Sequence, residues 1–213
     1  MATKTEICKY ALAKIGGGAQ SNQITDVDTD GTTTADLCVD FYDIVRKEVI
    51  SRGYWIEATK YADLDNATVT DKGAWSYASD APTDYLSRLK VIYEQTHTVM
   101  HPEKIQPIRH QMMGSYVFTD LYTNSAGDKV HAMYVYDLST EASFSVQLVE
   151  AIATKLGAEL APVIITEDGG YHRRMNLLNE YEKFLPQWLG ENQMSNYRDD
   201  QGAATCLTIA RWE

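Results

Sequence analysis

The segment "MYVYDLSTEASFSVQLVEAIATKLGAELAPVI", residues 133–164, changes its hydrophobic period partway along its length. Its first residues continue an alternating pattern that begins at Lys129 and is typical of a β-strand. From Glu141 to Leu160 the apolar residues recur every three or four positions, which predicts a long amphipathic helix. The apolar stripe comprises Phe144, Leu148, Ile152, Leu156 and Leu160, and the opposite face Ser143, Gln147, Glu150 and Thr154. A strand that runs directly into a long helix predicts a mixed fold.

A β-hairpin is predicted just upstream of this helix. Residues 115–122, "SYVFTDLY", and 129–137, "KVHAMYVYD", both alternate, and the loop 124–128 between them contains Gly127. Tyr116, Phe118 and Tyr122 share one side of the first strand, and Val130, Ala132, Tyr134 and Tyr136 one side of the second. Further upstream, "YWIEATKYADL" is aromatic and β-prone, and a strand or bent segment is expected at Leu89–Tyr93. We therefore predict a β insertion over residues 54–140.

Helices are predicted on both sides of this insertion. The first begins at Thr3 or Thr5 and ends at Gly16–Gly18, and the second begins at Thr33 or Thr34 and ends before Gly53. Their apolar faces comprise Ile7, Cys8, Ala11, Leu12 and Ile15, and Leu37, Cys38, Phe41, Val45 and Val49.

After the 141–160 helix, Thr166 is expected to cap a last helix that Pro186 ends or kinks, with Met175, Leu178, Tyr181 and Leu185 facing inward. The sequence therefore predicts an α+β fold: a bundle of about four helices (residues 1–53 and 141–190) with a small antiparallel β region that includes a long hairpin. Residues 1–190 form one domain in this interpretation, and residues 191–213 an extended C-terminal tail.

Composition narrows the possible functions. The chain has 213 residues, with 30 acidic against 19 basic residues and a formal charge of −11, which disfavours binding to nucleic acid through its phosphates. No apolar run approaches the length that spans a bilayer, and the N-terminus does not resemble a signal peptide. The three cysteines are widely spaced, which indicates free thiols in a reducing compartment. We expect synthesis in the cytosol and no association with a membrane.

Metal and catalytic motifs are weak. "DVDTDG", residues 26–31, matches the first half of an EF-hand loop, but Leu37 stands where a bidentate Glu is required. Three histidines lie within residues 97–110, where Pro102 and Pro107 exclude a helical metal-binding face. No G-x-S-x-G motif is present, and Cys8 and Cys38 lie on apolar helix faces. We predict no catalytic residue, cofactor or metal ligand. A calcium-binding interaction module and a peptidoglycan hydrolase with an Asp or Glu pair remain alternatives.

Two segments carry residues suited to contact a partner. Arg173 and Arg174, in the "HRR" near the start of the last helix, either form a solvated face or contact an acidic surface. The C-terminal "ATCLTIARWE" follows the polar linker "GENQMSNYRDDQG", which would let it reach a neighbouring molecule. Its alternative role is a strand of the protein's own sheet. The predicted docking residues of this segment are Leu207, Ile209, Arg211 and Trp212.

Several stretches together resemble the head-to-tail adaptor family of short-tailed bacteriophages, which includes tail tubular protein A and is also described as gatekeeper or head-completion protein. Residues 133–164 carry the most specific similarity, because a strand end and a Phe-containing cap precede a helix of the form EA-x-A-x-K-L-x-x-E-L-A. The resemblance runs from Ile7 to Leu189, and the residues past Gly190 have no counterpart. The other similar stretches are "ALAKIG" (11–16), "FYDIVRKEVISRGYWIEATKYADL" (41–64), "APTDYLSRLKVIYE" (81–94) and "YHRRMNLLNEYEKFLPQW" (171–188).

The resemblance implies a structural virion protein without catalytic activity. Members of the family join a helical bundle to a small β region, and about twelve copies form a ring beneath the portal protein. The ring extends the DNA channel, through which the genome passes without sequence-specific binding, and presents a platform to the tail nozzle protein and tail fibres. Aromatic residues would then suit contacts with a neighbouring subunit or the nozzle, or else cover the protein's own β region. These residues are Trp75, Tyr77, Tyr85, Tyr122 and Tyr134.

Overall fold

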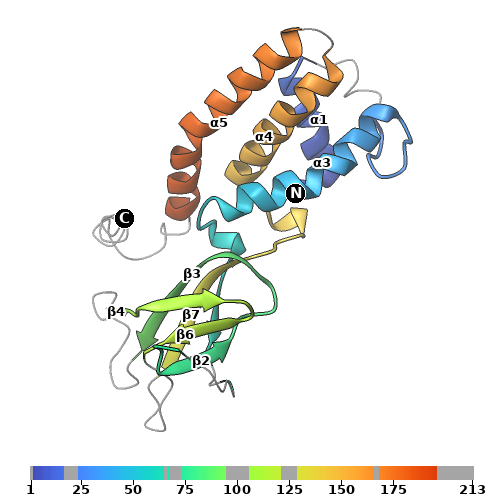
Figure 1. Ribbon diagram of the computed structural model, residues 1–213. Coiled ribbons are helices and arrows are strands. Elements are labelled where there is room, and N and C mark those ends of the chain that lie inside the picture. The colour runs from blue at the N-terminus through green and yellow to red at the C-terminus, as the bar shows by residue number, and fades with distance from the viewer. Residues whose placement is uncertain are drawn as a thin grey trace. The chain divides into compact units, whose positions relative to one another are not determined.

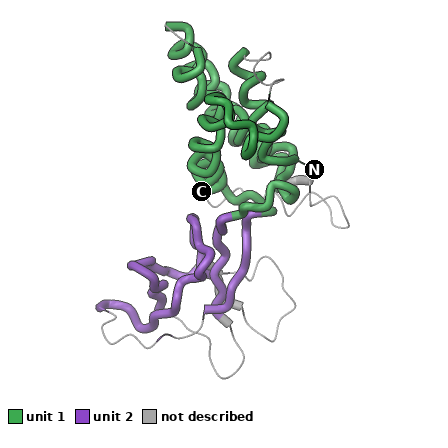
Figure 2. The backbone as a smooth tube through the Cα atoms, turned by 90° about the vertical axis from the view of Figure 1, so that its right-hand side faces the viewer, with its two compact units in different colours: residues 1–57, 138–201 green, residues 58–137, 202–213 purple. Residues whose placement is uncertain are grey.

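The computed structural model describes residues 2–16, 24–64, 67, 73–94, 106–120, 129–165 and 168–195 (Figure 1). The chain divides into two compact units, which Figure 2 shows in different colours. The described residues of the helical unit lie within 1–57 and 138–201, and those of the β unit within 58–137. The β unit is therefore inserted between two parts of the chain that together build the helical unit.

The first two described helices begin where their capping residues predict. Helix α1 spans Lys4–Lys14 and starts with a capping box between Thr3 and Glu6, and Gly16 follows its end with a φ of 89°. Helix α3 spans Thr33–Ser51, and the hydroxyl of Thr32 accepts a hydrogen bond from the backbone at its first turn. The predicted inward residues Cys8 and Cys38 are fully buried free thiols, so their assignment to the core is confirmed.

Helix α4, Val146–Ile164, is the centre of the helical unit and contacts α1, α3 and α5. The predicted stripe is buried, but Thr154, expected on the polar face, is fully buried as well and donates to the carbonyl of Glu150. This helix begins later than predicted, because Glu141–Ser143 form a short 3-10 turn and Ser145 caps α4. Gly157 lets α1 approach closely: a Cβ placed there would lie 3.1 Å from a carbonyl oxygen of that helix.

Helix α5, Asp168–Ser195, differs most from the prediction. It continues through Pro186 into the segment that we assigned to the tail. The proline removes one backbone donor, but contacts beyond it hold the helix together: the Trp188 ring lies 5.9 Å from that of Phe184, and Asn192 is buried. Of the residues predicted to face inward, Tyr181 and Leu185 are buried, whereas Met175 is 40% exposed and Leu177 is buried in place of Leu178.

The β unit contains two antiparallel sheets. The four-stranded sheet has the order β1-β7-β3-β4, and the three-stranded sheet the order β2-β6-β5. The predicted hairpin between residues 115–122 and 129–137 is therefore wrong: both strands form, but β6 pairs with β2 and β5, whereas β7 pairs with β1 and β3. A different, short hairpin does form: it joins β5 to β6 through a turn that contains Gly114, whose φ is 61°. The strands are β1 Thr59–Asp63, β2 Tyr77–Asp80, β3 Tyr85–Glu94, β4 Gln106–Pro107, β5 His110–Met113, β6 Tyr116–Thr119 and β7 Lys129–Tyr136.

One apolar cluster forms the core of the β unit and draws residues from both sheets. Val91 and Val130 come from the four-stranded sheet, Val117 from the three-stranded sheet, and Leu64 and Ile108 from the segments that follow β1 and β4. Strand β3 has a bulge between Ser87 and Lys90 and pairs regularly with β7 from Lys90 onward, so the element expected at Leu89–Tyr93 is a strand. A helical unit and an antiparallel β unit make the protein α+β, as predicted.

Candidate functional site

The aromatic residues predicted to lie at an interface have different environments. Trp75 and Tyr77 are half-buried, and the guanidinium of Arg109, itself 74% exposed, stacks 4.6 Å from the centre of the Trp75 ring. Tyr85 is half-buried and packs against the core of the β unit. Tyr134 belongs to that core and is only 4% exposed, which corrects its assignment to an interface. Tyr122 lies outside the described residues.

The predicted docking arginines are used within the helical unit. Arg173 donates to the backbone carbonyl of Lys14 at 2.9 Å, and Arg174 donates to Glu159 at the same distance. These bonds tie the first turns of α5 to the end of α1 and to α4, and both arginines are half-buried. Contact with an external partner stays a prediction. The docking residues Leu207, Ile209, Arg211 and Trp212 lie outside the described residues.

The aspartate-rich loop after α1 is held by protein donors. Asp26 accepts hydrogen bonds from the Thr5 hydroxyl and the Asp28 amide, both at 3.2 Å, and Asp28 pairs with Lys4 at 2.5 Å. Asp30 accepts from the backbone of Thr25 at 2.6 Å. Within the described ranges, no group of three His, Cys, Asp or Glu side chains could hold a metal ion. The three carboxylates thus fasten the loop to α1 and to itself.

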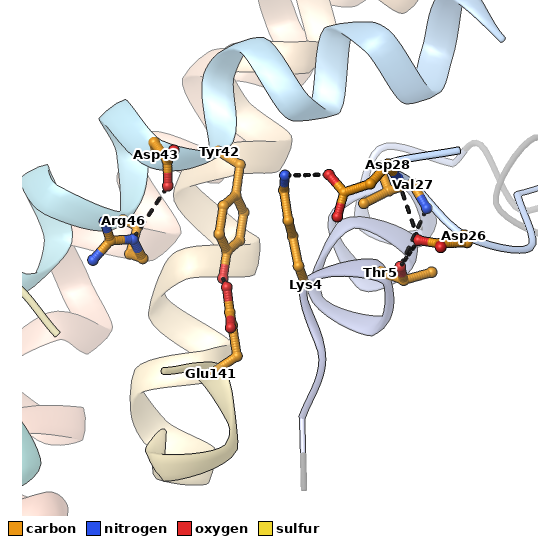
Figure 3. A network of polar contacts seen from close by, with 9 residues as sticks. All are labelled: Lys4, Thr5, Asp26, Val27, Asp28, Tyr42, Asp43, Arg46 and Glu141. Carbon is orange, nitrogen blue, oxygen red and sulfur yellow. Dashed lines mark hydrogen bonds and ion pairs between the residues drawn. The ribbon is translucent and has the colours of Figure 1, made fainter. Parts of the chain in front are cut away.

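A polar network continues from this loop across α3 to the chain segment that returns from the β unit (Figure 3). The ammonium of Lys4 lies 5.6 Å from the centre of the Tyr42 ring, and the Tyr42 hydroxyl donates to Glu141 at 3.3 Å. Burial, followed by the charge of Glu141, raises the pKa of the Tyr42 hydroxyl far above its ordinary value. One turn further along α3, the buried Arg46 donates to the carbonyl of Leu138 at 2.5 Å.

The outgoing connection to the β unit is held by a second buried network. Asn192, only 2% exposed, accepts from the backbone amide of Ile56 at 2.9 Å. Its amide nitrogen donates to Glu57 at 2.7 Å and to the hydroxyl of Ser145 at 3.0 Å. Glu57 in turn accepts from the Ser145 amide at 3.0 Å. These four residues, hereafter the crossing clamp, join α5, the start of α4 and the last residues before the β unit begins.

Both chain connections between the units are therefore fixed on the helical side. Arg46 holds the carbonyl of Leu138, where the chain re-enters the helical unit, and the crossing clamp holds residues 56 and 57, where it leaves. Buried polar groups that are fully paired specify one arrangement of the chain, because any alternative leaves a donor or acceptor without a partner. This geometry is suited to anchoring.

The sequence did not reveal the crossing clamp. Asn192 stood in a polar stretch that we interpreted as a linker, and its partners Glu57 and Ser145 are 135 and 47 residues away in the chain. Arg46 was likewise an ordinary charged residue on a predicted helix, although its burial, with 3% exposure, is rare for arginine.

Comparison with known proteins gives no identification. No family model matches the chain, and no curated protein matches it. A search of the described helices finds none that is long and apolar enough to cross a membrane.

Proposed function

We propose that the protein is a structural component of a short-tailed bacteriophage virion, a head-to-tail adaptor located between the portal protein and the tail nozzle. In this proposal about twelve copies form a closed ring in which each subunit contacts its neighbour through different surfaces. The ring extends the channel through which the genome passes and offers a platform to the nozzle protein and tail fibres.

The observation that carries the proposal is the agreement between the resembling sequence and the architecture that it implies. The adaptor family joins a helical bundle to a small β region, and this chain has a helical unit with an inserted β unit. The most specific stretch of resemblance, residues 133–164, forms the end of β7, the connection into the helical unit and the central helix α4. The resemblance therefore includes a connection between the two units.

The anchored chain connections support a structural role in a ring. A ring between head and tail has to keep its parts attached while DNA moves through it. Arg46 and the crossing clamp hold the helical-unit end of each chain connection through buried and partly buried hydrogen bonds.

The charge of the chain supports a lumen through which DNA slides. With a formal charge of −11, a ring of about twelve copies carries a large negative charge, and carboxylates facing the channel repel phosphates. Such a channel would let the genome pass without binding it.

Negative-stain electron microscopy of the purified chain mixed with the cognate portal tests the proposal. We expect an added ring of density at the narrow end of the portal, with portal alone and adaptor alone as controls. Bare portals beside free monomer would refute it. Lysis of peptidoglycan that one Asp or Glu substitution abolishes would support the hydrolase alternative instead. A calcium-induced gain in stability that Asp28→Ala removes would support the calcium module.

The tail is tested separately with a chain that lacks residues 202–213. If the tail docks on the portal, this variant remains folded but binds the portal more weakly than the full chain. Equal binding by both chains would refute the docking role of the tail while leaving the ring itself intact. A quadruple substitution of Leu207, Ile209, Arg211 and Trp212 by serine, at unchanged length, controls for loss of chain length.

A further inference from the structure

His110 bridges the two sheets of the β unit. It is the first residue of β5 in the three-stranded sheet, and its Nε2 lies 3.0 Å from the carbonyl oxygen of Leu89 in β3 of the four-stranded sheet. Its Nδ1 lies 2.8 Å from the carbonyl oxygen of Ile108, a residue of the shared core. The half-buried imidazole thus has a carbonyl oxygen at each of its two nitrogens.

A bulge in β3 presents the Leu89 carbonyl to the ring. Ser87 pairs with Val135 and Lys90 with Met133, so two residues of β3, Arg88 and Leu89, stand opposite one residue of β7. Arg88 has a φ of 51°, a left-handed conformation that non-glycine residues rarely adopt. Strained backbone of this kind persists where surrounding contacts fix it. The hydrogen bond from His110 is one such contact, because it gives a donor to the carbonyl of Leu89, the residue after the strained Arg88.

The protonation state of the imidazole decides how many of these bonds exist. A carbonyl oxygen can only accept, and a neutral imidazole has a single N–H donor, so its second nitrogen would direct a lone pair at an oxygen. The imidazolium has two N–H donors and satisfies both carbonyls. We propose that His110 is a proton-dependent latch between the two sheets, with two bonds in acid and one bond once the ring is neutral.

The other charged and titratable groups near the His110 ring do not change the proposal of a proton-dependent latch. On its own segment, Arg109 stacks on Trp75 and lies 4.0 Å from Asp120, the residue after β6. On β3, Arg88 and Lys90 flank the accepting residue, and on β6 the nearest titratable side chain is Tyr116. Among the described residues, no ion pair joins a carboxylate to His110, and its two ring nitrogens contact the carbonyls of Ile108 and Leu89. His131, which lies 2.7 Å from Asp63 across β7 and β1, is a second histidine contact in this unit and has to be controlled.

The latch is tested first on the unaltered full chain by nuclear magnetic resonance of the histidine rings. At pH 5 we expect both ring N–H protons of His110 to be protected from exchange with water, and at pH 8 only one. The exposed His172 of α5 serves as the internal reference, with unprotected ring protons at both pH values. Ring protons of His110 that exchange as fast as those of His172 at pH 5 would overturn the proposal, and this result needs no variant to fold.

Amide hydrogen exchange then measures the consequence for the sheets. After correction for the intrinsic pH dependence of exchange, protection of the β5–β6 hairpin should fall about fivefold between pH 5 and pH 8, the factor expected for one lost hydrogen bond. His110→Gln should remove this difference, whereas His131→Gln and His172→Gln should keep it. If His131→Gln removes the difference and His110→Gln keeps it, the proton-dependent contact is the Asp63–His131 pair and the latch is refuted. The inference is independent of the proposed virion role, because both measurements use the isolated chain.

Discussion

Replacing Asn192 tests whether the crossing clamp stabilises the helical unit as its geometry indicates. Asn192→Ala removes the acceptor of the Ile56 amide and the donor to Glu57 and Ser145, at a position that is 2% exposed. A buried donor left unsatisfied costs about 1–3 kcal/mol, and the charged Glu57 places the loss toward the upper end of that range. We expect the free energy of unfolding to fall by about 3 kcal/mol.

Urea denaturation followed by tryptophan fluorescence measures this change, because Trp55 is fully buried beside the clamp residues in sequence. Gln193→Ala is the matched control: it alters the adjacent, exposed residue, whose side chain makes one hydrogen bond at 3.3 Å, and should change stability by less than about 0.5 kcal/mol. If both variants unfold at the same urea concentration, the clamp does not stabilise the protein and the argument from buried polar pairing is refuted. Asn192→Asp adds a sharper test. This substitution places a carboxylate next to Glu57, where the wild type has an amide donor. Two neighbouring carboxylates repel each other, so the variant should regain stability as the pH falls and one of them is protonated.

Three further predictions, made with four substitutions, test other parts of the structure. Gly157→Ala should destabilise the helical unit by about 1–3 kcal/mol, because its Cβ would lie 3.1 Å from a carbonyl oxygen of α1. Gly190→Ala, with open space around its Cβ, should instead stabilise the protein by about 0.5–1 kcal/mol. Equal effects of the two substitutions in thermal unfolding would contradict the close approach of α1 to α4. Tyr181→Phe should leave stability unchanged or raise it by about 1 kcal/mol in urea denaturation, because the buried hydroxyl has no hydrogen-bond partner among the described residues. A clear loss of stability would show that the hydroxyl has a hydrogen-bond partner in solution and would contradict this prediction. Burial, followed by the hydrogen bond to Asp84, raises the pKa of Tyr134 to about 12. An unfolded tyrosine titrates at about pH 10, so the contribution of Tyr134 to stability is complete below that pH and is lost as the pH rises through 12. The difference in unfolding free energy between the wild type and Tyr134→Phe should therefore shrink between pH 10 and pH 12, and a constant difference would refute this account.

Local signals in the sequence located most elements of the fold. Helix starts at Thr3 and Thr32 follow from side chains that satisfy the first backbone amides, and this requirement involves only residues three positions apart. The burial of α4 follows from its apolar period. Its later start is marked by Ser145, whose hydroxyl accepts a hydrogen bond from the Leu148 amide, whereas the Thr140 side chain makes no capping bond.

Strand pairing could not be predicted in the same way. Alternation shows which residues share one face of a strand, but not which strand lies beside it. The β6 and β7 sequences both alternate and are close in the chain, which favoured a hairpin, yet β6 joins the three-stranded sheet and β7 the four-stranded one. The short turn at Gly114 brings β5 next to β6 instead, and β5 was not predicted as a strand.

The candidate site escaped prediction for a related reason. A buried Asn or Arg is identified by its partners. The partners of Asn192, and the Leu138 carbonyl that Arg46 binds, lie between 47 and 136 residues away in the chain. The same reasoning changes the role of Arg173 and Arg174, which looked available to a partner and instead donate within the helical unit. Polar residues predicted from sequence to bind an external partner therefore need a check for internal acceptors before they enter a docking model.

The anchored connections and the proposed latch should respond differently to pH. Arg46 and the crossing clamp fix the chain on the helical side of both connections and contain no histidine, so their strength should not change between pH 5 and pH 8. The His110 contact lies within the β unit, between its two sheets, and in the proposed latch it depends on the protonation of the ring. Hydrogen exchange in α4 and α5 should therefore remain constant while that of the β5–β6 hairpin changes. If the helices lose protection together with the hairpin, the pH response is global unfolding and neither the clamp nor the latch acts as a separate element.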